Sequence, residues 1–174
     1  MVRPVTVTAA VALLIPAGLS AATRQRVGSA EPIYAAVAIV ATGKPIVRRC
    51  GGYTVTTARY TGNSNSPDPR MAGKVAFAGR FAVNTGGTSG VATGQFVIRD
   101  RRNRIRMKAN LRGVMTQRTT VNGIVSGSLS LPSARLIVNV TIVFDEILRF
   151  GAVRLGLESG ANSGVAYPPV PRCK

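Results

Sequence analysis

The sequence contains no histidine and no tryptophan, and six of its 174 residues are acidic. The lack of histidine excludes Ser-His-Asp and Cys-His catalysis and removes the most common zinc ligand. Asp145 and Glu146 are adjacent in an expected strand, so they point to opposite faces and form no catalytic pair. There is no phosphate-binding loop and no dinucleotide fingerprint. The sequence therefore disfavours an enzyme and predicts neither a metal nor a cofactor.

Aromatic residues are also scarce, at 5%, whereas glycine occurs 19 times and hydrophobic residues make up 45% of the chain. This composition favours many short strands joined by glycine-rich turns over helices. The length suits one domain with a substantial core.

The shortage of acids leaves a strongly basic protein, with 23 Lys and Arg residues and a formal net charge of +17. A GC-rich genome would explain a preference for arginine over lysine, but it would not explain the missing acids. A surface of this charge attracts polyanions such as acidic wall polymers, anionic lipid headgroups and nucleic acid.

Residues 1–22 have the pattern of a secretory signal peptide. Arg3 is followed by an apolar core over 5–19, and small residues stand at Ser20 and Ala22, where a signal peptidase reads them. The core is shorter than the roughly 20 apolar residues that a membrane span needs, so cleavage is favoured over an uncleaved anchor. We therefore expect a secreted protein or one on the exterior of the cell envelope.

The chain has two cysteines, Cys50 and Cys173. In an oxidising compartment such a pair normally forms a disulfide. A metal pair or a catalytic thiol is disfavoured, because no histidine is available as a second ligand or as a base. We predict a structural Cys50–Cys173 bridge.

The domain organisation follows from where strand-like patterns begin. Residues 23–49 are predicted to be a linker or N-terminal extension, in which the apolar stretch 33–43 is either an added strand or a short helix. Residues 50–174 form the predicted β-barrel domain. About eight strands are expected, over 52–60, 71–83, 91–100, 105–113, 121–131, 135–146, 151–158 and 162–170.

The alternation of apolar residues predicts which side chains face inward. Successive strands with short loops pair antiparallel, and glycines within strands permit the sharp coiling of a small closed barrel. A β-sandwich is the alternative. In a barrel of about eight strands, the side chains that face the lumen would fill it. The large ones are Phe77, Phe81, Phe96 and Phe144.

Several short motifs carry a family resemblance: Cys50, TGNSNSPDPRMAG (61–73), GTSGVATGQFVIRD (87–100), LIVNVTIVF (136–144), RLGLESG (154–160) and PRC (171–173). Through them the chain resembles small exported barrel proteins of unknown function from high-GC bacteria, whose fold is similar to the allene oxide cyclase and calycin-like barrels. The resemblance covers about residues 50–173. It implies a fold and a location, and no active-site motif of the cyclase is matched.

The run RDRRNRIRMK, residues 99–108, contains six cations and one acid. It is either a solvated hairpin whose charges guard against edge pairing, or an anion-binding site. No aromatic residues interleave with the arginines, so a stacking platform for nucleic acid is disfavoured. An anionic envelope polymer or lipid headgroup is the expected partner. The candidate anion-binding residues are Arg101, Arg102, Arg104, Arg106 and Lys108.

Two functions remain open. The first is an exported basic barrel that binds a ligand or associates with the cell envelope without catalysis. The alternative is a barrel enzyme of the isomerase or cyclase type that acts on an apolar small molecule in its lumen. A filled lumen would disfavour both catalysis and the storage of a small ligand inside the barrel.

Overall fold

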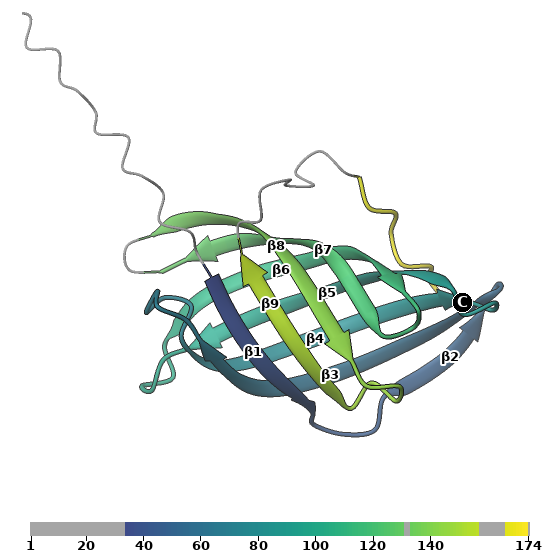
Figure 1. The fold of residues 1–174 in the computed structure, drawn as a ribbon, viewed down its shortest axis with the longest axis horizontal. Helices are drawn as coiled ribbons and strands as arrows, with labels where there is room; N and C mark the ends of the chain where they lie inside the picture. The colour runs from purple at the N-terminus through teal and green to yellow at the C-terminus, as the bar shows by residue number, and fades with distance from the viewer. Residues whose placement is uncertain (1–33, 131–132, 157–165, 174) are drawn as a thin grey trace, which may run out of the picture. The chain divides into compact units, whose positions relative to one another are not determined.

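The computed structural model describes residues 34–130, 133–156 and 166–173, and none of these residues is helical (Figure 1). The signal peptide predicted over 1–22 and residues 23–33 of the predicted extension lie outside the described residues. The strands are β1 Tyr34–Ala41, β2 Ile46–Cys50, β3 Tyr53–Asn65, β4 Gly73–Asn84, β5 Ser89–Arg99, β6 Ile105–Thr116, β7 Thr120–Leu129, β8 Ala134–Phe144 and β9 Phe150–Gly156.

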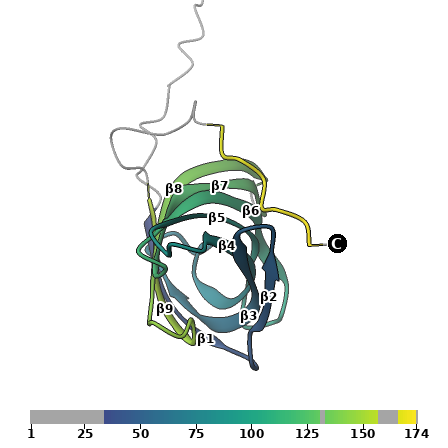
Figure 2. The same ribbon diagram turned by 90° about the vertical axis from the view of Figure 1, so that its right-hand side faces the viewer.

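Eight of these strands close into an antiparallel barrel. From β3 to β9 each strand pairs with the next, and β1 closes the ring by pairing with β9 on one edge and β3 on the other. Figure 2 shows the strands curving round into this ring. The remaining strand, β2, lies outside the ring and pairs with the first half of β3. The predicted all-β closed barrel is confirmed.

The strand that completes the ring differs from the sequence-based expectation. The barrel begins at Tyr34 rather than at residue 50, because the apolar stretch 33–43 supplies β1. β3 continues through residues 61–65, which the sequence predicted as a loop, because these residues pair with β1. Residues 166–170 of the predicted last strand have no regular secondary structure and belong to no sheet.

Aromatic side chains fill the lumen, as the alternation predicted. Phe77, Phe81 and Phe96 are completely buried, Phe144 nearly so, and Tyr60 joins them from β3. The rings of Phe77 and Phe96 stack with their centroids 4.2 Å apart. Burying one such ring stabilises the fold by about 1.5–3 kcal/mol.

Two glycines make room for these rings. Gly79 and Gly94 are cross-strand partners on β4 and β5. A Cβ on Gly79 would stand 2.5 Å from the Phe81 ring, and one on Gly94 would collide with the Phe77 ring. The strand glycines noted in the sequence therefore serve the packing of the lumen as well as the curvature of the sheet.

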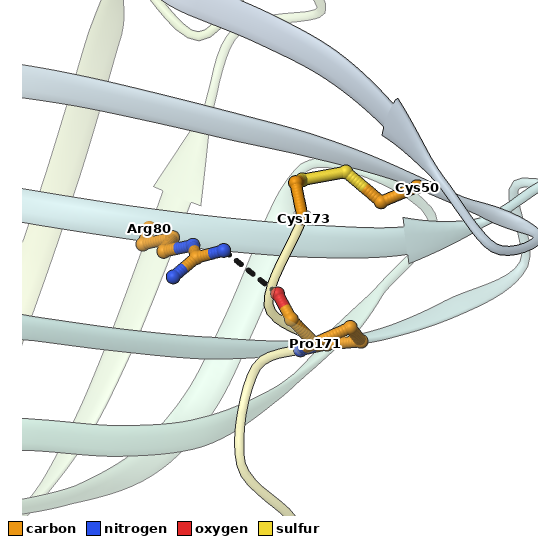
Figure 3. Close-up of a disulfide and its surroundings, with 4 residues drawn as sticks. All are labelled: Cys50, Arg80, Pro171 and Cys173. Atoms are coloured by element: carbon orange, nitrogen blue, oxygen red, sulfur yellow. Dashed lines mark hydrogen bonds between the residues drawn. A yellow bond between two sulfur atoms is a disulfide. The ribbon is translucent and has the colours of Figure 1, made fainter.

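A second, smaller core lies outside the barrel, beneath residues 166–173, which we name the C-terminal strap. Val170 of the strap packs with Val55 and Ala82, which point outward from β3 and β4. The predicted disulfide is present: Cys173 is bonded to Cys50 at the end of β2, with their Cα atoms 5.2 Å apart. Figure 3 shows this bond beside Arg80, whose Nη2 donates a hydrogen bond to the Pro171 carbonyl at 2.7 Å.

Candidate anion-binding surface

The predicted cationic run, residues 99–108, forms the hairpin between β5 and β6, and we name it the arginine hairpin. Asp100 organises its turn. The Asp100 Oδ1 accepts hydrogen bonds from the backbone N–H groups of Arg102 and Arg104, both at 2.9 Å. Asn103, at the tip, takes a left-handed φ of 62°, which asparagine tolerates better than most residues.

The same carboxylate pairs with two of the predicted anion-binding arginines. The Asp100 Oδ2 lies 2.9 Å from Arg104 Nε and 2.9 Å from Arg106 Nη2. Hydrogen bonds from the Arg104 backbone and side chain lower the pKa of Asp100 to about 2, so it stays ionised at any ordinary pH. The hairpin does bring all five predicted residues to one end of the sheet. However, only Arg101, Arg102 and Lys108 are left without an acidic partner there.

Two further acids also serve turns. Asp68 forms an ion pair with Arg70 at 2.6 Å and accepts its backbone N–H, and the Arg70 hydrogen bond lowers the pKa of Asp68. Asp145 accepts the backbone N–H groups of Arg149 and Phe150 in the β8–β9 turn. Three of the four acids in the described part of the chain are thus committed to local structure.

A different cluster of arginines lies on the outer wall of the barrel. Arg80, Arg112 and Arg172 line a cleft of about 330 Å³ that is covered on one side by the C-terminal strap. We name it the arginine cleft. Its other lining residues are Thr93, Tyr167, Pro168, Pro169 and Val170.

Strand register explains how these residues meet. Arg80 on β4 pairs with Thr93 on β5, and Thr93 pairs with Arg112 on β6, so the three form one row across the sheet. All three belong to the outward-facing set of their strands. Because neighbouring strands lie about 4.8 Å apart, the Arg80 and Arg112 Cα atoms are about 10 Å apart. The disulfide at Cys173 then fixes Arg172 at the edge of this row.

No described residue places a carboxylate in the cleft. The lining residues given above include no acid, and none of the ion pairs among the described residues involves Arg80, Arg112 or Arg172. Arg80 uses one N–H on Pro171, and a guanidinium has five. Arg112 and Arg172 are exposed to solvent. The arrangement can therefore bind an oxyanion by charge-assisted hydrogen bonds from more than one side.

Sequence reasoning missed this cleft because its cations come from three distant segments. Alternation within 71–83 and 105–113 puts Arg80 and Arg112 on the polar faces of two different strands, but it does not show that the two residues meet. The useful signal in the sequence was the predicted disulfide. Because it joins Cys173 to Cys50, it brings Arg172 close to the first strands of the predicted barrel domain.

The described residues contain no group of three His, Cys, Asp or Glu side chains that could hold a metal ion. Within the same residues, no helix is long and apolar enough to cross a membrane.

By its fold the chain is a closed eight-stranded antiparallel barrel with one accessory strand and a disulfide-anchored strap. No protein-family model, curated protein or solved structure matches the sequence. The resemblance to exported calycin-like barrels therefore stays a prediction.

Proposed function

We propose that this protein is an exported, non-catalytic binding module that holds anionic groups of the cell envelope in the arginine cleft. The observation that carries the proposal is the cleft itself: three guanidinium groups share it, and no carboxylate of the described residues lines it. The ligand group is a phosphate or carboxylate, which either an acidic wall polymer or a lipid headgroup would supply.

The net charge supports this role at longer range. A formal charge of +17 attracts polyanions to the whole surface, while the cleft provides a site of defined shape. The exposed cations of the arginine hairpin would add weak, salt-sensitive contacts, because surface charges are screened beyond about 8 Å at physiological ionic strength.

The packing of the lumen favours binding over the alternative, catalysis on an apolar substrate inside the barrel. Phe77, Phe81, Phe96 and Tyr60 occupy the interior. A substrate of the expected kind would have to displace these buried rings.

A pair of matched variants tests the proposal. R112Q/R172Q removes two charges from the cleft, and R101Q/R102Q removes two unpaired charges from the hairpin. The four residues are exposed, and their side chains make no hydrogen bond that the fold requires. The probes are polyphosphate, poly-glutamate, and vesicles with and without an anionic lipid, each titrated at low and high salt.

We expect R112Q/R172Q to weaken binding roughly tenfold at low salt, since each exposed charge pair contributes about 0.5–1 kcal/mol. R101Q/R102Q should weaken it about twofold. Comparing the polymer probes with the vesicles identifies the source of the anionic group. Equal losses in the two variants would mean that only net charge matters, and the proposal would be wrong.

Export is tested separately. The mature protein should begin near Thr23 and carry a formal charge of +16, because residues 1–22 contain one cation, Arg3, and no acid (17 − 1). Intact mass of secreted material would establish this. A full-length chain retained in the membrane fraction would contradict it.

A further inference from the structure

A second concave site lies at one end of the barrel, away from the arginine cleft. It has a volume of about 480 Å³, and we name it the mouth cup. It shares no residue with the arginine cleft. Its lining residues are Arg49, Thr54, Thr56, Val83, Asn84, Thr85, Arg118, Glu146 and Leu148.

The topology explains why a cup forms here. β1 ends opposite Tyr60, so the first residues of β3 extend beyond the ring. β2 pairs with that extension and places Arg49 beside Thr54. The β6–β7 and β8–β9 turns supply the rest of the wall with Arg118, Glu146 and Leu148.

Unfavourable backbone geometry is concentrated at this cup. Among the described residues other than glycine, four have positive φ, and two of those four line the cup: Arg118 at 60° and Leu148 at 56°. Such conformations cost free energy and persist where the surrounding structure enforces them, often at binding sites. The Arg118 guanidinium also lies over Gly87, where any Cβ would collide with it.

The Leu148 turn is held from inside the barrel. The Tyr60 hydroxyl donates a hydrogen bond to the Leu148 carbonyl at 2.9 Å. The Asp145 carboxylate fixes the other side of the turn through the Arg149 and Phe150 N–H groups. Leu148 packs against the lumen core, so this apolar side of the cup is built before any ligand arrives.

The chemistry of the lining selects a ligand class. Arg49 and Arg118 outnumber Glu146, and no ion pair joins any of these three groups in the described structure. Val83 and Leu148 provide an apolar surface. The volume lies within the range of about 300–1,000 Å³ that is typical of small-molecule sites.

We propose that the mouth cup binds a small amphipathic carboxylate, with its carboxylate between Arg49 and Arg118 and its apolar part against Val83 and Leu148. This site is independent of the proposed function, because a ligand here contacts none of the arginines of the cleft. It also differs from a lumen site, since the lumen below is filled by buried side chains.

The probes are octanoate, octanol and acetate, used below the concentration at which octanoate forms micelles and measured by calorimetry on the oxidised protein. Octanoate should bind saturably. Octanol lacks the charge and acetate lacks the apolar part, so each should bind at least fivefold more weakly. R118Q and R49Q should each weaken octanoate binding at least fivefold, and R112Q/R172Q should leave it unchanged.

Several results would overturn this proposal. One is the absence of saturable octanoate binding, and another is equal affinity for acetate. Octanoate binding that survives both R118Q and R49Q would also overturn it. Because R112Q/R172Q addresses the cleft alone, loss of polyanion binding with intact octanoate binding would leave the two sites distinguished.

Discussion

The arginine hairpin and the arginine cleft differ in one respect that matters for binding: where the nearest carboxylate lies. In the hairpin, Asp100 stands among the cations and pairs with Arg104 and Arg106. In the cleft, Thr93 occupies the position between Arg80 and Arg112, and the described part of the chain contributes no acid to the lining. The denser charge run therefore has two of its cations paired with an acid, whereas the described acids pair with no arginine of the cleft. Counting the cations in a stretch of sequence is therefore a weak guide to an anion site. A better guide is whether cations that lie close together in the fold have an acid among them.

The largest expected effect comes from removing the disulfide that holds the cleft together. C50A/C173A opens a loop with a sequence separation of 123 residues, and the chain-entropy model assigns such a bridge about 4–5 kcal/mol. The free energy of unfolding should fall by about that amount, as measured by urea denaturation. At a temperature where the variant is still folded, polyanion affinity should fall to that of R172Q, because Arg172 is no longer fixed while Arg112 keeps its place on β6.

The mechanism is checked by combining the two sets of changes. Adding R172Q to C50A/C173A should cause little further loss of affinity. An additional loss as large as that of R172Q in the wild type would show that the disulfide does not position Arg172.

A smaller effect is expected when an acid is placed in the cleft. T93D introduces a carboxylate between Arg80 and Arg112 and so reproduces the situation of the hairpin. Polyanion binding at low salt should fall by about tenfold, since two ion pairs would have to be broken. T93N, which adds a polar group of similar size without charge, is the matched control and should bind like the wild type. Unchanged affinity in T93D would mean that the cleft is not the site.

The reverse change in the hairpin should have the smallest effect. D100N keeps an oxygen that can accept the Arg102 and Arg104 N–H groups, so the turn should persist, but Arg104 and Arg106 lose their ionic partner. Affinity for polyphosphate should rise by roughly threefold at low salt. The gain should disappear in D100N/R104Q/R106Q. No gain in D100N would show that Asp100 does not limit the hairpin.

Most of the fold could be predicted from local patterns. The alternation in 71–83, 105–113 and 135–146 identified the strands and their buried faces, and Phe77, Phe81, Phe96 and Phe144 fill the lumen as expected. The sequence did not decide whether β1 is a strand or a helix. Alanines such as Ala36 and Ala38 occupy its outward face, so the stretch is apolar on both sides and shows no alternation. β2 has four exposed residues and lies outside the ring, which leaves no alternation to detect.

The candidate site could not be predicted in the same way. A run such as 99–108 is visible in sequence, whereas the row from Arg80 through Thr93 to Arg112 depends on the register of three strands. Pairing preferences alone do not fix that register, since it is determined by which faces of the whole barrel are buried. The role of Asp100 is also only partly visible in the sequence: it is the one acid among the cations of 99–108, but its two ion pairs depend on the geometry of the turn.

The central claim is that the cleft, and not the hairpin, is the anion site, and arginine side-chain NMR tests it most directly. The Nε–Hε resonances of the oxidised, ¹⁵N-labelled protein would be followed during a titration with inorganic pyrophosphate at physiological salt. We predict saturable shifts for Arg80, Arg112 and Arg172, with small, non-saturating changes for Arg104 and Arg106. Saturable shifts centred on the hairpin arginines, with the cleft arginines unmoved, would contradict the claim.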